Sequence, residues 1–540
     1  MAKGAGSKVP ETRSWQVRWV GRCRSCIRAT AGVGRGAAQF AADEWYFARK
    51  WWRQTPVQRK RTWQVTAGSA VAGLAVAAGA VAAAGPWDSG QRTAERARAA
   101  RWDGRGGERH GDGPAAPGAA PVLAALGAPV KGGGDGAPPP TGDGLADALA
   151  PLLKAPALGP VRTASVVDVA TGREVFASRP ARPATPASTI KLGTAVAALT
   201  ALGPDHRFTT KAVQDGRTKD GTPRVVLVGG GDPTLTARTP GRGTPAAQRP
   251  AALGDLAADT ARALKKHGTK KVTLRYDDSL YEGAALHPIG PNENLAPVTA
   301  LTADEARLDR SDHGPAPRAT DPSAEAARAF ADDLRAHGIQ VTGRTSDAEA
   351  RRTATRLAAA PSLPLSSIVE RMLTHSDNDI AEQLARQTAV ATGQPTTFRG
   401  GGRAVQRTLG QLRVPVAKTV FADGSGLDRD DRVSARLLSR VLLLAAAPDH
   451  PELRPVLTGL PVAGFTGTLE ARYADEAAGA GAVRAKTGTL TGVNTLAGTV
   501  VDADGRLLTF AFMTNGAGDG SAAQQSLDRL ASAVANCGCR

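Results

Sequence analysis

The sequence predicts an α+β protein in which helices surround an antiparallel sheet and an inserted mixed α/β region interrupts the domain. Three observations support this class. Strand-like alternation occurs near both ends of the folded part, apolar residues at helical spacing fill the segments between, and a mixed region lies in the middle. Because 540 residues exceed one compact domain, we expect several units joined by linkers.

The expected elements follow from local pattern and are given in chain order. Apolar residues three and four apart predict helices, alternation predicts strands, and Thr171–Gly172 separates two strands as in a hairpin. The predicted helices are 145–156, 183–202, 325–338, 366–392 (two helices), 434–447 and 521–536. The predicted strands are 161–172, 173–180, 225–235, 272–281 and a strand pair over 481–515.

The first 63 residues form a basic, tryptophan-rich segment. They hold 14 Lys/Arg and 3 Asp/Glu, which accounts for most of the formal net charge of +18. All eight tryptophans lie in the first fifth of the chain: Trp15, Trp19, Trp45, Trp51, Trp52, Trp63, Trp87 and Trp102. Such a segment can bind nucleic acid. An apolar stretch follows directly, however, so the charge is explained without nucleic acid and we expect no such partner.

Residues 64–85, QVTAGSAVAGLAVAAGAVAAAG, carry no charge and are long enough to span a bilayer. Arg59, Lys60 and Arg61 precede them, so the positive-inside rule places the N-terminal side in the cytoplasm and exports the rest. Ala82 and Ala84 form an A-x-A cleavage pattern. The segment is therefore expected to be a membrane anchor or a signal that is removed, and residues 1–63 are expected to be cytoplasmic or to reflect an over-long start whose true position is near codon 57.

Four cysteines occur as two close pairs, Cys23/Cys26 and Cys537/Cys539. The predicted topology puts the pairs on opposite sides of the membrane, which excludes a four-cysteine zinc site. It also allows the exported pair to be oxidised, either within the pair or to another thiol.

Composition divides the remaining chain. Residues 86–142 are rich in Gly, Pro and Ala and are expected to form a flexible linker. The segments 143–205 and 356–540 are expected to form one domain, because strands from both contribute to the predicted sheet. Residues 206–355 are then an insertion into that domain.

Ser188 and Lys191 form the first candidate motif. A nucleophilic serine needs a base on the same rigid element, and side chains three apart share one face of a helix. The apolar helix that follows would bury Lys191 beside the hydroxyl, where desolvation lowers the pKa of an amine. The alternative is a helix cap followed by a lysine with a buried stem and an exposed ammonium.

Two further motifs follow in order. Ser376-Asp377-Asn378 lies between two predicted helices, where a loop can present a hydroxyl and an amide, although the same residues also make a good N-cap. The strand segment 486–489 combines an ammonium, two hydroxyls and a residue without a side chain, which suits a ligand carboxylate; an ordinary hairpin edge is the alternative. Its residues are Lys486, Thr487, Gly488 and Thr489. Each motif alone is weak, but all three in this order predict one site.

The ordered set S-x-x-K, S-x-N and K-T-G resembles the penicillin-recognising serine acyl-transferases. The long interval between the first two motifs, GGGDPTL at 229–235 and ADGSGLDRDDRVSARLL from 422 are similar to the D-alanyl-D-alanine carboxypeptidase/endopeptidases of the low-molecular-mass class C penicillin-binding proteins, peptidase family S13. The resemblance covers about residues 143–540. It implies a serine β-lactamase/transpeptidase-like domain interrupted by extra domains.

The resemblance also implies residue roles. Ser188 would attack the carbonyl between two D-alanines and be acylated, with Lys191 taking its proton. Ser376 would relay a proton to the leaving amine, and Asn378 would hold the amide of the donor strand. Lys486, Thr487 and Thr489 would bind the terminal carboxylate on the strand that contains Gly488. Backbone N–H groups of Ser188 and Thr489 would form the oxyanion hole.

The implied partners are peptidoglycan stem peptides, with β-lactams as acylating inhibitors, on the extracytoplasmic side of the bacterial cell membrane. No metal or cofactor is required. Two positions depart from the family pattern, and both bear on donor-strand specificity: Asp428 stands where a small polar residue usually follows DGSGL, and Leu295 stands where an aromatic ring is expected. Asp423 and Ser425 are expected to form a turn or to shape the cleft.

Three other interpretations remain. A serine β-lactamase uses the same motifs but needs a deacylating Glu in an E-x-x-L-N context, which is absent between Asn378 and Lys486. A catalytically silent wall-binding protein would keep the cleft without turnover, and the intact Ser188–Lys191 motif argues against it. The basic N-terminal segment with Cys23 and Cys26 is the third, as a partner-binding module.

Overall fold

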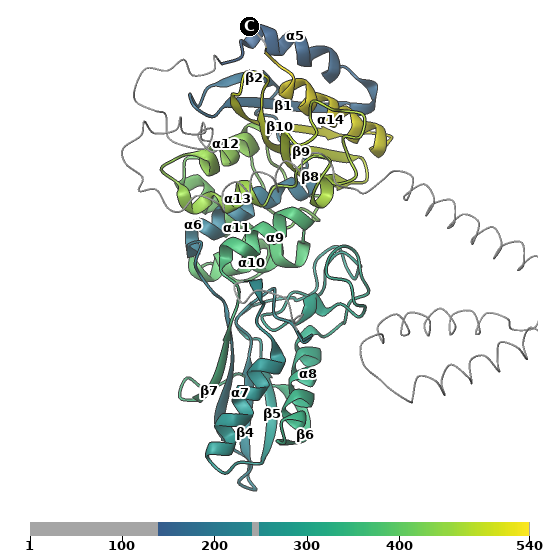
Figure 1. The fold of residues 1–540 in the computed structure, drawn as a ribbon. Helices are drawn as coiled ribbons and strands as arrows, with labels where there is room; N and C mark the ends of the chain where they lie inside the picture. Colours follow the sequence, from purple (N-terminus) through teal and green to yellow (C-terminus); the bar gives the residue numbers. More distant parts are fainter. Residues whose placement is uncertain (1–138, 240–247, 539–540) are drawn as a thin grey trace, which may run out of the picture. The chain divides into compact units, whose positions relative to one another are not determined.

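The computed structural model describes residues 139–239 and 248–538, which contain two five-stranded sheets (Figure 1). The first sheet is antiparallel throughout, in the order β2-β1-β10-β9-β8. Its strands are β1 (Val161–Asp168), β2 (Glu174–Ser178), β8 (Val483–Leu490), β9 (Val493–Val501) and β10 (Leu507–Asn515). Because β1 pairs with β10, the two ends of the described chain share one sheet, and the predicted α+β class is confirmed.

Helices cover both faces of this sheet. Along β10, Phe510 and Phe512 point into a core with the first and last helices, whereas Ala511 and Met513 point into a second core on the opposite face. The helices of the first core are α5 (Gly142–Leu153) and α14 (Gly520–Ala535). Those on the other side are α6 (Lys191–Leu202), α9 (Leu365–His375), α10 (Asn378–Ala391), α11 (Phe398–Gln411), α12 (Ala435–Ala446) and α13 (Pro455–Thr458).

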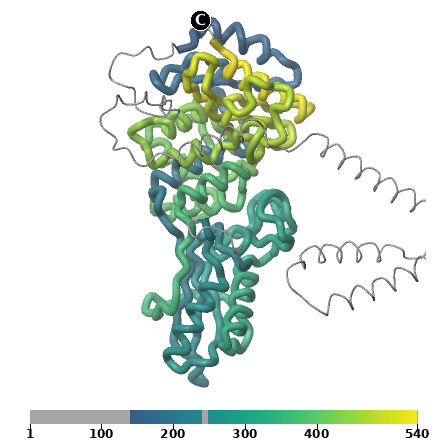
Figure 2. Tube along the Cα trace, viewed as in Figure 1, coloured from purple at the N-terminus to yellow at the C-terminus, as the bar shows by residue number. Residues whose placement is uncertain are grey.

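The second sheet lies between α6 and α9 in the sequence and has a separate core. Its order is β6-β5-β4-β3-β7, with β4, β5 and β6 parallel to one another. The strands are β3 (Thr209–Arg217), β4 (Pro223–Val228), β5 (Lys271–Asp277), β6 (Gln340–Asp347) and β7 (Thr355–Pro361). Parallel neighbours need a crossover, and α7 (Leu253–Lys266) and α8 (Pro322–Ala336) provide the two. Figure 2 shows this part in teal at the bottom of the view, below the blue and green segments of the helical layer.

A long connection, residues 278–321, joins β5 to α8 and contacts α10. Ala296 N donates to Asp379 Oδ1 at 2.9 Å, and Gln383 Nε2 donates to Thr299 O at 2.8 Å. Gln383 and Asp379 both belong to α10, so the first turns of this helix form hydrogen bonds with the inserted region. We call residues 278–321 the connecting lobe.

The local predictions differ from the structure at several elements, and strands β3, β6 and β7 and helices α7 and α13 were not predicted. The predicted strand pair over 481–515 is three strands, because Gly492 and Gly505, both with positive φ, end β8 and β9 in tight turns. Helix α11 was not predicted, since three consecutive glycines lower its helix propensity. The structure shows why they occur: a Cβ at Gly402 would lie 2.0 Å from Phe421 O.

No helix in the part of the chain that the structure describes is long and apolar enough to cross a membrane. Residues 64–85, the predicted membrane segment, lie outside the described residues, as do the basic segment 1–63 and nearly all of the linker 86–142. Cys537 is buried and disulfide-bonded, and Cys539 lies outside the described residues.

Candidate active site

Ser188 lies on a single 3-10 turn, Ala187–Ile190, that leads directly into α6. Lys191 is the first residue of α6, and its Nζ donates to Ser188 Oγ at 2.9 Å. Ala187 has φ 47°, a left-handed conformation that costs a non-glycine residue about 1 kcal/mol. Gly426, with φ 87°, packs against this turn, and a Cβ there would lie 2.1 Å from Ala187 O. The turn that presents the Ser188 hydroxyl is therefore strained, and the packing of Gly426 against it stabilises this conformation.

Lys191 is completely buried and makes three hydrogen bonds. Besides Ser188, it donates to Asn378 Oδ1 at 2.7 Å and to the backbone carbonyl of Ser425 at 2.6 Å. Burial lowers its pKa to about 8, although the negative charges of Asp423 and Glu382 work in the opposite direction. A substantial fraction is therefore neutral near pH 8, as a general base for Ser188 requires.

The second motif forms the junction of α9 and α10. Ser376 ends α9 in a left-handed conformation with φ 59°, and Asp377 caps α10 by accepting from Ile380 N at 3.0 Å. Asn378 is the first residue of α10. Its Oδ1 accepts from Lys191 and its Nδ2 donates to Asn294 O at 2.9 Å, so both ends of the amide are already engaged.

Lys486 is also completely buried but has different surroundings. Its Nζ donates to Ser376 Oγ at 2.8 Å and to Thr487 O at 2.7 Å. Within residues 139–239 and 248–538, no carboxylate lies at ion-pair distance from it. Burial, together with the charge of Lys191, holds its pKa well below the usual lysine value. A buried ammonium group that meets only neutral oxygens is suited to an incoming anion.

The strand that carries Lys486, β8, is the edge of the first sheet. Val483 and Ala485 bond through their backbones to residues 463 and 461 on the outer side. Since backbone groups alternate along a strand, Thr487 and Thr489 direct theirs to the same outer edge, beyond the end of that pairing. The Thr489 N–H and a strand-like peptide can therefore meet there.

Gly488 is required by a close approach of backbone to backbone. A Cβ at this position would lie 2.6 Å from Pro186 O, 3.1 Å from Ser188 N and 2.2 Å from Thr495 Oγ1. Thr495, on β9, itself donates to Pro186 O at 2.7 Å. The missing side chain thus lets β8 lie against the serine turn and brings the first and third motifs together.

Several contacts at this site were not predicted from the sequence. Thr468 Oγ1 accepts from Thr487 Oγ1 at 2.9 Å, and Gln524 Nε2 donates to Thr489 Oγ1 at 3.4 Å. The carbonyls of Asn294 and Ser425 also contribute, and no side-chain pattern signals a backbone acceptor. The expected turn at 423–426 is present, and its Ser425 carbonyl adds a contact with the base.

The two departures from the family pattern have plain structural roles. Leu295 is buried with Val298 and Phe398 in a small apolar cluster. Asp428 donates its backbone N–H to Asp423 Oδ2 at 2.7 Å and caps Asp430 N through its side chain. Neither contact involves the serine hydroxyl.

Two groups of buried acids lie close enough together to consider a metal ion: His287/Glu382/Asp423 and Glu305/Asp377/Asp379. In the first group, the backbone N–H groups of residues 424, 425, 426 and 428 already donate to the carboxylates. In the second, Arg307 pairs with Glu305 and Arg318 with Asp379. Apart from Asp377 Oδ2, which has no hydrogen-bond partner in the described part of the chain, the carboxylates of both groups already have donors in the protein, a pattern typical of structural carboxylates.

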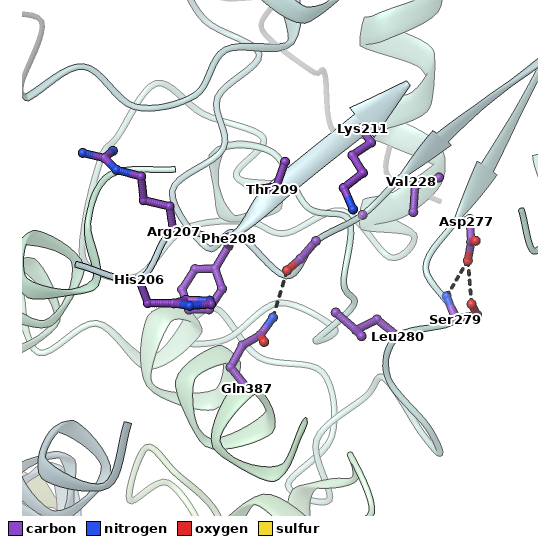
Figure 3. A pocket seen from close by; sticks show the side chains of 12 residues that line it. His206, Arg207, Phe208, Thr209, Lys211, Val228, Asp277, Ser279, Leu280 and Gln387 are labelled. Atoms are coloured by element: carbon purple, nitrogen blue, oxygen red, sulfur yellow. Dashed lines mark hydrogen bonds between the residues drawn. The ribbon is translucent and has the colours of Figure 1, made fainter. Parts of the chain in front are cut away.

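A cavity of about 400 Å³ lies elsewhere, at the ends of β3, β4 and β5 beside α10 (Figure 3). Two hydrogen bonds join residues that line this cavity: Gln387 Nε2 donates to Gly230 O at 2.9 Å, and Ser279 Oγ donates to Asp277 Oδ1. None of the residues of the three motifs lines it. The Ser279–Asp277 contact joins residues two apart in one turn, and no serine in contact with a buried lysine lines the cavity, so the Ser188 cluster is the stronger candidate.

Comparisons with known proteins identify the family of this chain. Residues 145–314 and 308–536 match the family described as the D-Ala-D-Ala carboxypeptidase 3 (S13) family. The chain is 36% identical over 443 residues to a carboxypeptidase of Mycobacterium tuberculosis (strain ATCC 25618 / H37Rv), covering 80% of this chain and 92% of that protein. It is 38% identical over 412 residues to the carboxypeptidase DacB of Mycolicibacterium smegmatis (strain ATCC 700084 / mc(2)155), covering 75% and 86%.

The fold also has a solved counterpart. The crystal structure of penicillin binding protein 4 (dacB) from Haemophilus influenzae superposes with a TM-score of 0.58 at 23% identity, covering 71% of this chain and 97% of that one. This likeness confirms the predicted transpeptidase-like fold. The family match and the two curated relatives confirm the predicted serine-type carboxypeptidase, and the chain belongs to the D-Ala-D-Ala carboxypeptidase 3 (S13) family.

Proposed function

We propose that this chain hydrolyses the terminal D-Ala–D-Ala bond, and the equivalent cross-link bond, of peptidoglycan stem peptides through an acyl-enzyme on Ser188. The observation that carries the assignment is the contact between Lys191 Nζ and Ser188 Oγ at 2.9 Å, with Lys191 buried and its pKa lowered to about 8. The D-Ala-D-Ala carboxypeptidase family supports D-Ala-D-Ala peptide substrates, and the penicillin binding protein 4 of Haemophilus influenzae, solved in complex with a β-lactam, supports β-lactam inhibitors.

In the acylation step, Ser188 Oγ forms a bond to the carbonyl carbon while Lys191 accepts the hydroxyl proton. The backbone N–H groups of Ser188 and Thr489 stabilise the oxyanion. As the C–N bond breaks, a proton passes through Ser376 to the leaving amine of D-alanine. Water then attacks the ester carbonyl, releases the shortened peptide and restores the Ser188 hydroxyl.

Recognition depends on the β8 edge. The substrate extends along this edge as an added strand, with its terminal carboxylate at Lys486, Thr487 and Thr489. Asn378 holds the donor amide after exchanging one of its two present contacts, either the one with Lys191 or the one with the Asn294 carbonyl.

The test is an intact-mass time course of the full chain with benzylpenicillin, with peptide mapping and a Ser188→Ala control. We expect a long-lived penicilloyl adduct on the Ser188 peptide and none in S188A, together with release of D-alanine from a diacetyl-Lys-D-Ala-D-Ala peptide. Rapid loss of the adduct with catalytic drug hydrolysis would indicate a β-lactamase. No adduct on a folded sample would reject the serine assignment.

We also propose that the catalytic part acts on the extracytoplasmic side of the bacterial cell membrane, anchored by residues 64–85 or released after cleavage. The uncharged segment and the basic residues before it support this location. Cell fractionation followed by N-terminal sequencing tests it. Recovery of the protein only from the cytoplasm would contradict the proposal.

A further inference from the structure

A buried histidine of the connecting lobe is linked to the catalytic lysine through Asp423 and the turn that follows Asp423. His287 has a side chain that is 1% exposed, and its Nε2 is 3.2 Å from Asp423 Oδ2. Its Nδ1 accepts from Ile289 N at 3.3 Å, which places the proton of the neutral ring on Nε2. His287 is therefore a donor to Asp423.

Asp423 organises the turn that follows it. Its carboxylate is completely buried and accepts backbone N–H groups of Ser425 at 3.0 Å, Gly426 at 2.6 Å and Asp428 at 2.7 Å. The carbonyl of Ser425, in the middle of this turn, accepts from Lys191 Nζ at 2.6 Å. The position of the carbonyl that Lys191 contacts therefore depends on Asp423, together with Glu382, which accepts from Ser425 N at 2.8 Å.

We propose that His287 is a positioning residue for the acylation reaction, holding the Asp423 carboxylate so that the 423–428 turn keeps Lys191 against Ser188. This inference rests on the proposed role of Ser188 and Lys191. It assigns to the inserted region a direct part in the catalytic geometry, since His287 belongs to the lobe between β5 and α8 and not to the sheet or helices that carry the motifs.

The structure holds the histidine firmly. The buried guanidinium of Arg386, on α10, donates to Glu282 O at 3.2 Å and Ala284 O at 2.9 Å, just before His287 in the chain. The same guanidinium lies 4.3 Å from the centroid of the Phe398 ring, and that ring meets His287 edge-on at 4.8 Å. The helix that begins with Asn378 thus also fixes the segment that carries His287.

The charges around the His287–Asp423 contact allow a positioning role of His287 to be distinguished from a role in packing alone, because they influence the pKa of Lys191. Burial lowers the pKa of His287, but the hydrogen bond to Asp423 and the nearby carboxylates outweigh burial and raise it. The charge on Asp423 is the largest influence that keeps Lys191 protonated. Four other titratable groups face this region: Glu382, Asp428, Asp431 and Lys191. Loss of the His287 donor disfavours the charged form of Asp423 and therefore lowers the pKa of Lys191.

The experiment compares His287→Leu and His287→Gln in the full chain. The leucine removes the donor, whereas the glutamine amide can still donate to Asp423. The readouts are the second-order rate of acylation by benzylpenicillin and its pH profile. For H287L we expect the second-order acylation rate to fall at least about tenfold, and the rise of this rate with pH to occur at lower pH than in wild type. For H287Q we expect an acylation rate within a few-fold of wild type. His206→Leu, another histidine that meets a phenylalanine edge-on, is the matched control and should keep the wild-type profile.

Acylation of H287L at the wild-type rate with an unmoved pH profile would overturn the inference, as would an equal loss in H287L and H287Q. If H287L does not fold, His287→Asn replaces it, because the shorter amide does not reach Asp423. Loss in H287N with activity in H287Q supports the inference, and equal behaviour of the two rejects it. If wild type itself is not acylated, or S188A is, the proposed function fails and this inference fails with it.

Discussion

Lys191 and Lys486 are both completely buried, both belong to the same site, and their surroundings differ. The hydrogen-bond partners of Lys191 are neutral oxygens, and burial lowers its pKa to about 8 against the opposing charges of Asp423 and Glu382. Lys486 donates to the hydroxyl of Ser376 and to a backbone carbonyl, and burial together with the charge of Lys191 holds its pKa well below the usual lysine value. Lys191 can therefore gain and lose a proton near pH 8. Lys486 has no carboxylate of the protein at ion-pair distance within the described residues, and the carboxylate of the substrate can supply that anion.

The comparison predicts the largest effect at Lys191. Lys191→Met keeps much of the side-chain volume but removes the base, so acylation by benzylpenicillin should fall by about 10³-fold or more. Stopped-flow or intact-mass kinetics would measure the rate, with circular dichroism to check folding. A K191M rate within tenfold of wild type would mean that another group deprotonates Ser188.

Lys486→Met should instead impair recognition of the substrate carboxylate. A charge-assisted hydrogen bond contributes about 1.5–3 kcal/mol, so kcat/KM for a peptide ending in D-Ala-D-Ala should fall by about 10- to 100-fold. The same peptide with a C-terminal amide separates the two roles. Wild type should prefer the free acid and K486M should not.

A matched exposed lysine provides the control for this experiment. Lys211 is an exposed residue near the start of β3, in the inserted sheet. Lys211→Met should keep the preference for the peptide with the free C-terminal acid. If K486M also keeps the preference, Lys486 is not the carboxylate receptor.

Gly488→Ala tests the contact that brings the two lysines into one site. Its Cβ would lie 2.6 Å from Pro186 O and 3.1 Å from Ser188 N, so β8 must move away from the serine turn. Overpacking of this kind costs about 1–3 kcal/mol, and both the melting temperature and the acylation rate should fall. Gly518→Ala, where no atom lies within 4 Å of the added Cβ, should change neither. Equal behaviour of the two variants would show that β8 tolerates a side chain there.

The pH dependence should show the smallest and most specific effect. The neutral form of Lys191 increases as the pH rises, so the acylation rate should rise about tenfold per pH unit below about 8 and level off above it. Burial raises the pKa of Glu382 to about 7, so above that pH its negative charge favours the protonated form of Lys191. Glu382→Gln removes this charge, so the rise in rate that reports Lys191 should move to lower pH. Measured rates from pH 5.5 to 9.5 decide this, and a rise moved to higher pH would contradict the electrostatic account.

The sequence alone was sufficient to predict the α+β class, most elements and the three motifs. Helical spacing placed Ser188 and Lys191 on one turn because that relation is local. The same reasoning placed Ser376-Asp377-Asn378 between two helices, and α9 and α10 meet there. Short-range steric rules and the apolar pattern determine these features, so a single sequence contains them.

Other features depend on residues far apart in the chain, and only the tertiary structure shows them. The carbonyl of Ser425, 234 residues after Lys191, and the donor His287, 136 residues before Asp423, meet their partners through packing that no local pattern encodes. The two lysines have the same chemistry in the sequence. Both ammonium groups contact neutral oxygens, and which of them is also influenced by the charges of buried carboxylates is decided by how the helices, the edge strand and the connecting lobe pack, because burial and charge are properties of the assembled site.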